Sequence, residues 1–146
     1  MILPVVTRSC FAALLVASVC SACGGGSTAS PERIVRSWSA ALNAGDNERA
    51  ASLFAHDAHV VQGNVVLIFH TRAEAVVWNA SLPCSGRIVA LHRNGDEVTA
   101  TFVLGDRTTS ACDGPGARAR ALFRVQHGKI VLWHQLPSGG SGLPQV

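Results

Sequence analysis

The clearest pattern of apolar positions begins near residue 30 and is helical. Ile34, Trp38 and Leu42 recur at a spacing of four residues, which is typical of the buried face of a helix. Ser30-Pro31-Glu32 combines a hydroxyl cap, a proline suited to the first turn and an acid near the positive end of the helix. We therefore predict a helix that starts after Ser30 and ends at Asn43-Ala44-Gly45-Asp46.

Two shorter helices are predicted next. The second runs from about Asn47 to His56 and buries Ala50, Leu53 and Phe54. Thr71-Arg72-Ala73-Glu74 is a capping box, in which a hydroxyl and a carboxylate each bind a free backbone N–H at the start of a helix. The third helix therefore covers about Ala75 to Ala80, and Pro83 ends it.

The other apolar runs predict strands. His59–Gln62 and Val65–Phe69 are short and are joined by a turn at Gly63-Asn64. Two long hairpins follow, Gly86–Arg93 with Glu97–Arg107 around Asn94-Gly95, and Ala117–Gln126 with Lys129–Leu136 around His127-Gly128.

The register of each hairpin predicts which side chains are buried. A two-residue loop at Asn94-Gly95 places Leu91 opposite Val98 and Val89 opposite Ala100, on the face that also carries Phe102 and Leu104. In the second hairpin both faces are apolar, with Phe123, Val125, Ile130 and Leu132 on one and Leu122, Trp133, Arg120 and Gln135 on the other. We expect helices to cover one face of the sheet and another surface, such as a second copy in a homodimer, to cover the other.

The first 22 residues have the features of an export signal. Arg8 precedes an uncharged run from Ser9 to Val19, which is too short to span a bilayer as a helix. Ser21-Ala22-Cys23 resembles the end of a bacterial lipoprotein signal, in which the cysteine receives the lipid, although Cys20 stands where that signal usually has leucine. We expect a signal peptide over 1–22, a flexible tether over 23–29 and a protein held on the outer face of a bacterial membrane, with simple secretion as the alternative.

Cysteine usage agrees with export. Cys10 and Cys20 leave with the leader and Cys23 carries the lipid, so that Cys84 and Cys112 remain. These two are expected to form a disulfide in an oxidising compartment, at neighbouring ends of the first long hairpin. The bond would contribute roughly 3–4 kcal/mol in the chain-entropy model. A metal site is not favoured, because the two cysteines lack a C-x-x-C spacing.

Composition and charge exclude some functions. An apolar fraction of 48% with 14% charged residues indicates a folded domain. A net charge of +3 with scattered arginines does not fit a nucleic-acid-binding surface. No phosphate-binding loop or nucleophile elbow is present, so we expect no cofactor.

The order of elements, with three stretches of sequence, resembles the nuclear-transport-factor-2-like superfamily, which includes ketosteroid isomerase and SnoaL-type cyclases. The stretches are Trp38-Ser39-Ala40-Ala41-Leu42-Asn43-Ala44-Gly45-Asp46, Ala51-Ser52-Leu53-Phe54-Ala55-His56-Asp57-Ala58 and Phe123-Arg124-Val125-Gln126-His127-Gly128-Lys129-Ile130. The resemblance covers residues 30–137 and leaves 138–146 as a disordered tail. It implies an α+β fold of the cystatin-like roll type, in which three helices and a curved antiparallel sheet form a cone.

The resemblance also implies a pocket for a small apolar ligand inside the cone. Our candidates for contact with that ligand are Trp38, Gln62, Trp133 and Gln135. Isomerases of the superfamily carry a carboxylate base at the position matched by Gln62, and their oxyanion hole uses a tyrosine, which this chain lacks. An amide cannot take a proton from carbon, so isomerase chemistry of that type is disfavoured.

Two function classes remain open from the sequence. The first is a domain that binds a small apolar molecule, or another protein of the cell envelope, without catalysis. The second is a SnoaL-like enzyme, an isomerase, cyclase or hydrolase, with His70 or His134 as the base. A metal centre is not expected, because His56 and His59 beside Asp57 have no third fixed ligand.

The lipid anchor gives a first test. We expect mass spectrometry of the membrane fraction to find an acylated N-terminal peptide that begins at Cys23, and a Cys23→Ala variant to leave that fraction. An unmodified Cys23 at the mature N-terminus would instead mean a secreted protein.

Overall fold

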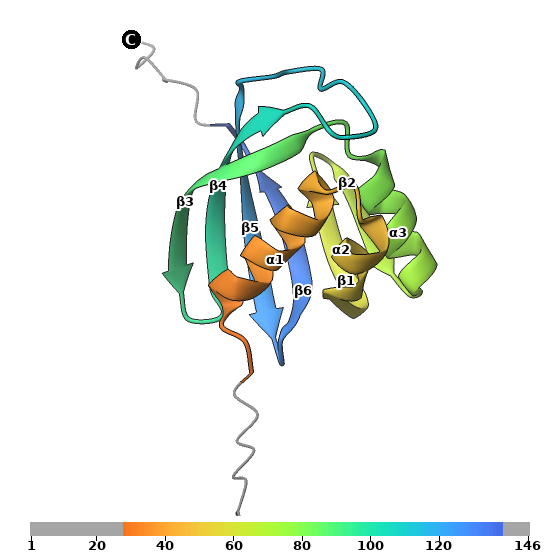
Figure 1. Cartoon of the computed structure of the whole chain (residues 1–146). Coiled ribbons are helices and arrows are strands. Elements are labelled where there is room, and N and C mark those ends of the chain that lie inside the picture. Colours follow the sequence, from red (N-terminus) through yellow and green to blue (C-terminus); the bar gives the residue numbers. More distant parts are fainter. Residues whose placement is uncertain (1–27, 139–146) are drawn as a thin grey trace, which may run out of the picture.

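The computed structural model of the chain describes residues 28–138 (Figure 1). The predicted signal peptide, most of the tether and the tail from residue 139 lie outside the described residues. In chain order the elements are α1 (Pro31–Asn43), α2 (Asn47–Ser52), β1 (Phe54–Gln62), β2 (Val65–Phe69), α3 (Arg72–Ser81), β3 (Ser85–Asn94), β4 (Glu97–Gly105), β5 (Arg118–Gln126) and β6 (Lys129–Leu136). Between residues 28 and 138 no helix has the length and apolar character needed to cross a membrane.

The six strands form one curved sheet in the order β2-β1-β6-β5-β4-β3. α1 lies across the concave side of β3, β4 and β5, while α2 and α3 pack together beside β1 and β2 (Figure 1). The predicted α+β cone with three helices is therefore confirmed. The expected all-antiparallel sheet needs one correction, because β1 and β6 pair in parallel.

The predicted caps of the first and third helices are confirmed, although α3 begins at Arg72, three residues before the predicted start at Ala75. The side chain of Ser30 accepts a hydrogen bond from the backbone N–H of Arg33, and Pro31 opens α1. At α3, the N–H of Glu74 donates to Thr71 Oγ1 over 3.3 Å, and the N–H of Thr71 donates to Glu74 Oε2 over 2.9 Å. The same bond from Thr71 is the main cause that holds the pKa of the Glu74 carboxyl below its usual value.

The second helix is shorter than predicted. We expected it to reach His56, but α2 ends at Ser52 and β1 begins at Phe54. The carbonyl of Leu53 accepts a 2.8 Å hydrogen bond from the backbone N–H of Ile130, and Phe54 pairs with Ile130. Pairing with β6 therefore outweighs the local preference for helix.

The register of the first long hairpin also differs from the prediction. Asn94 pairs with Glu97, so the loop residues are Gly95 and Asp96. Gly95 has a φ of 63° whereas Asp96 has no positive φ, which fits a turn with glycine at its first position rather than the expected Asn-Gly turn. Leu91 thus faces Ala100 instead of Val98, a shift of two residues that keeps the side chains between Ala90 and the turn on their expected faces.

Two β-bulges account for the remaining differences. One lies between Ile88 and Ala90 and leaves Val89 38% exposed, although Val89 was expected in the core. The other lies where the partner of Arg124 is Leu132 and that of Val125 is Ile130. It places Trp133 opposite Phe123, on the buried face, where the sequence had placed these two on opposite faces.

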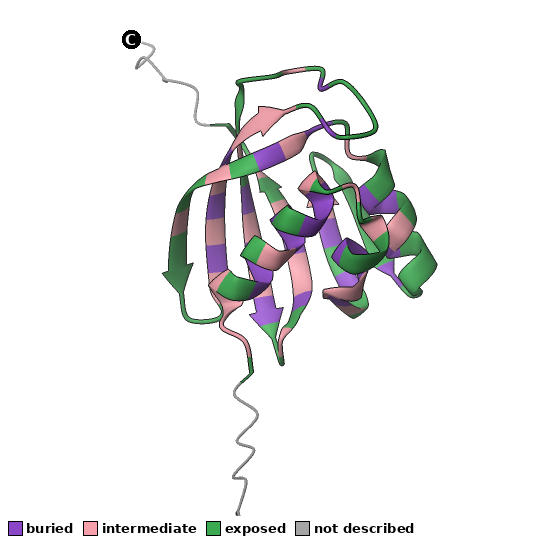
Figure 2. Cartoon of the chain, viewed as in Figure 1, coloured by how far each residue is buried: buried purple, intermediate pink, exposed green. Residues whose placement is uncertain are grey.

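The core of the described chain is aromatic on the concave side. Burial alternates along β4 and β5, whose buried positions face the helices (Figure 2). Neighbouring rings lie with centroids 5.0–6.5 Å apart and mostly edge to face, the geometry that aromatic pairs prefer. They are Trp38, Phe54, Phe69, Trp78, Phe102, Phe123 and Trp133.

The predicted disulfide is confirmed. Cys84 and Cys112 are bonded, with their Cα atoms 4.6 Å apart. Cys84 immediately precedes β3, and Cys112 lies in the loop that follows β4. The bond therefore fastens that loop to the start of the first long hairpin.

Arg107 holds the same loop to the helices from inside. Only 6% of its surface is exposed, and burial lowers the pKa of its guanidinium. Its Nη1 donates to the carbonyls of Asn79 and Leu82, at 2.6 and 2.8 Å, and its Nη2 donates to Asn47 Oδ1 at 2.7 Å. A cation at the C-terminal end of α3 is favourable, because unpaired carbonyls accumulate there.

We predict that Arg107→Met destabilises the domain by about 2–4 kcal/mol, because one buried and two partly buried acceptors lose their donor. The melting temperature should fall by roughly 10 °C or more. Arg118→Met, at an exposed arginine, is the matched control and should leave the unfolding curve unchanged. Equal curves for the two variants would show that the buried guanidinium contributes no net stability.

Candidate functional site

A cavity of about 330 Å³ lies between α1 and the concave face of the sheet. All four residues that the sequence put forward for ligand contact line it: Trp38 from α1, Gln62 from the end of β1, and Trp133 and Gln135 from β6. Other walls come from Leu42, Leu82, Phe102, Leu104, Ala119 and Ala121. The structure thus brings the candidates together, and their role in binding stays a prediction.

Strand pairing explains why two amides meet at the mouth of the cavity. Val60 and Trp133 pair across β1 and β6 and are both buried. Because side chains alternate along a strand, Gln62 and Gln135, two residues further on, share the face of Val60 and Trp133. Both amides are exposed, and neither side chain hydrogen-bonds another residue of the described chain. Each can therefore donate to and accept from a ligand.

A residue that the sequence analysis missed holds Trp38, one of the cavity walls, in place. Asn79 of α3 is fully buried, and its Oδ1 accepts a 2.9 Å hydrogen bond from Trp38 Nε1. Its Nδ2 donates to the carbonyl of Ala75, so the amide cannot turn freely. The signal in the sequence was a polar residue directly after Trp78, on the buried side of a short helix.

A second missed element fixes the wall beside α1. Asn43 binds both backbone groups of Gly86, and Ser39 donates to the same carbonyl over 3.0 Å. A Cβ at Gly86 would lie 3.1 Å from the ring of Phe102, so a larger residue would push this wall of the cavity inwards. Glycine at position 86 therefore leaves room for the ring of Phe102.

The cavity lining holds no acid–base pair. Its only ionisable side chains are Asp113 and Arg120, beside fifteen described positions that do not titrate once the disulfide has formed. Asp113 Oδ1 lies 3.2 Å from Cys84 Sγ, which is a contact and not a hydrogen bond, because the bonded sulfur carries no hydrogen. A general base needs a titratable group with a partner that orients it.

The two histidines proposed as alternative bases lie away from the cavity lining. His70, at the end of β2, is 64% exposed, and its Nδ1 lies 2.6 Å from Asp57 Oδ1. His134 pairs with Val61 and Leu122 and, one residue from Trp133, takes the opposite face of the sheet. Neither histidine therefore lines the cavity in the cone.

Asp57 is the centre of an exposed charged group. Its second oxygen lies 2.8 Å from His56 Nδ1, and its backbone φ is 58°. The pKa of the Asp57 carboxyl is lowered, chiefly by its hydrogen bond with His70 and to a smaller extent by His56. Since all three side chains are more than half exposed, solvent screens these pairs.

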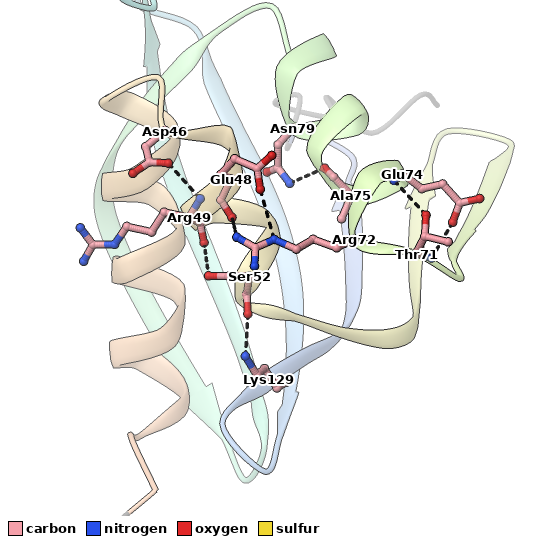
Figure 3. A network of polar contacts seen from close by, with 10 residues as sticks. All are labelled: Asp46, Glu48, Arg49, Ser52, Thr71, Arg72, Glu74, Ala75, Asn79 and Lys129. Carbon is pink, nitrogen blue, oxygen red and sulfur yellow. Dashed lines mark hydrogen bonds and ion pairs between the residues drawn. The ribbon is translucent and has the colours of Figure 1, made fainter.

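A second cavity of about 330 Å³ lies between α2, α3 and the start of β6. Its lining includes an arginine and a lysine, Arg72 and Lys129, and each binds another residue of the domain. Arg72 Nε lies 3.2 Å from Glu48 Oε2, and Lys129 Nζ donates to the carbonyl of Ser52 (Figure 3). These contacts tie α2 to α3 and to β6, so we read this cavity as part of the helix packing.

Three comparisons bear on the family. Comparison with curated proteins finds no match to this chain. Among solved structures, an NTF2-like protein of unknown function from Cytophaga hutchinsonii is 12% identical, with 76% of this chain and 92% of that chain covered and a TM-score of 0.63. A protein with a ketosteroid isomerase-like fold from Catenulispora acidiphila, in complex with trimethylamine, is 23% identical over 77% and 90%, with a TM-score of 0.59.

A third structure, assigned as a polyketide cyclase from Sinorhizobium meliloti, is 16% identical over 71% of this chain and 94% of that chain, with a TM-score of 0.58. At these identities the likeness shows the fold alone. The sequence itself matches the SnoaL-like domain over residues 35–133, which runs from the second turn of α1 to Trp133 in β6. The chain belongs to the SnoaL-like domain family.

Proposed function

We propose that this domain binds a small, neutral and largely apolar molecule in its cone, without converting it, at the outer face of a bacterial membrane. The lipid on Cys23 would hold the domain there, next to molecules that enter or leave the cell envelope.

One observation carries the proposal: the four candidate residues line a largely apolar cavity, and the two polar ones among them, Gln62 and Gln135, are neutral amides. Aromatic and aliphatic walls with a few polar groups are typical of small-molecule sites. Amides can orient a carbonyl, hydroxyl or carboxamide group but do not transfer protons at neutral pH. A volume of about 330 Å³ suits a molecule of one ring or a short chain.

The second candidate function is an enzyme of the SnoaL type. Its support is the Sinorhizobium neighbour assigned as a polyketide cyclase. In this chain, Gln62 replaces the carboxylate base that isomerases of the superfamily carry, and His70 and His134 lie outside the cavity lining. A substrate would have to react without an oriented base, so binding accounts better for the geometry.

We predict that benzamide binds to the full chain and quenches its tryptophan fluorescence, because Trp38 and Trp133 form the wall. Ala119→Leu fills the cavity and should weaken benzamide binding by roughly tenfold or more, which is about 1.4 kcal/mol. Ala90→Leu, at an exposed position of β3, is the matched control and should bind as the parent does. Loss of binding in both variants, or in neither, would place the probe elsewhere.

A second variant tests the amide at the mouth. Gln62→Leu should weaken benzamide binding by about fivefold to tenfold and leave ethylbenzene, a probe of similar shape without hydrogen-bonding groups, unaffected. Equal losses for the two probes would argue that Gln62 acts only through shape. If neither probe binds the parent protein, the cone is not a small-molecule site.

A further inference from the structure

The two edges of the sheet differ in how they are protected. β3, at one edge, carries Arg87, His92 and Arg93, and a bulge interrupts its pairing next to Val89. Charges and bulges are the usual means by which an edge strand avoids pairing with another chain. The β3 edge is therefore closed to further strands.

β2, at the opposite edge, has no such protection (Figure 1). Four consecutive aliphatic residues are 40–58% exposed, on both faces of the strand, although they would normally be buried: Val65, Val66, Leu67 and Ile68. The strand from Val65 to Phe69 contains no charge, no proline and no glycine. Its outer row of backbone donors and acceptors has no strand partner in the described chain.

α3 extends the same apolar surface. Val77 is 69% exposed, the highest value among the large apolar residues of the described chain that lie on the surface. A groove of about 470 Å³ runs between β2 and α3, lined by Leu67, Ile68, Phe69, Ala73, Glu74, Val77, Trp78 and Ser81. An added strand beside β2 would place its helix-side residues under Val77 and fill this groove.

We propose that β2 pairs antiparallel with β2 of a second copy of this chain, about a two-fold axis at Leu67. In that register Val65 faces Phe69 and Val66 faces Ile68 of the other copy, so every cross-strand pair is aliphatic or aromatic. Asn64 faces His70, and no two like charges meet. A symmetric pair of this kind uses both unprotected edges at once and leaves none open.

This surface differs from the one that the sequence suggested for a homodimer. There the second copy was expected to cover the open face of the sheet. That face carries the ion pair of Arg124 with Glu97, whose closest atoms are 2.6 Å apart and which raises the pKa of the guanidinium. The apolar residues with the greatest exposure lie instead at the β2 edge and on α3.

The test measures the mass of the protein by light scattering. The full chain is expressed in a bacterial host, which processes its N-terminus, and is purified in detergent. The mass of the bound detergent is then subtracted. We expect a dimer for the parent. Leu67→Lys and Leu67→Glu should each raise the dissociation constant by about 100-fold or more, because two like charges then face each other. An equimolar mixture of the two variants should restore the dimer, since opposite charges pair.

Val89→Lys places the same charge at the protected β3 edge and is the matched control, which should remain dimeric. Recovery in the mixture also shows that the single variants are folded. A monomeric parent, or a Leu67→Lys variant that stays dimeric, overturns the proposal. A monomeric parent that binds an unrelated protein would also contradict the proposal, because the β2 edge would then serve another partner.

Discussion

The indole of Trp38 connects α1 with the sheet and with α3, and the cavity depends on these contacts. Its ring centroid lies 5.2 Å from that of Phe123 and 6.3 Å from that of Phe102, which fixes α1 on the sheet. Its N–H is bound by Asn79 on α3, so the two helices cannot shift independently. A buried donor that lost this acceptor would cost about 1–3 kcal/mol. The same ring is core on one side and cavity wall on the other.

Local chemistry made much of the fold predictable, and sheet curvature explains what was not. The Ser30 and Thr71 caps, the turn at His127-Gly128 and the disulfide depend on neighbouring residues or on one pairing, and all are confirmed. The end of α2 and the two bulges depend on strands far away in the sequence. The bulge opposite Arg124 turned Trp133 into the core, and no period-two pattern could have shown this.

The candidate site was predictable in composition but not in its supports. Trp38, Gln62, Trp133 and Gln135 came from a resemblance, and the structure gathers them around one cavity. Asn79, Asn43 and Gly86 hold that cavity open through backbone and side-chain bonds across more than 40 residues of sequence. Such bonds leave no local pattern, because polar residues that pair at a distance look like ordinary surface residues until the partners are known.

The cavity and the groove at the β2 edge are separate surfaces whose walls touch each other. No residue lines both the cone and the groove beside α3, so pairing at β2 would leave the mouth of the cone open. Trp133 lines the cone, Trp78 lines the groove, and their ring centroids are 5.0 Å apart. In a close-packed interior a displaced ring must move its neighbour. A ligand that shifts Trp133 would therefore reach the groove through Trp78, and a second copy seated there would restrict how far Trp133 can move.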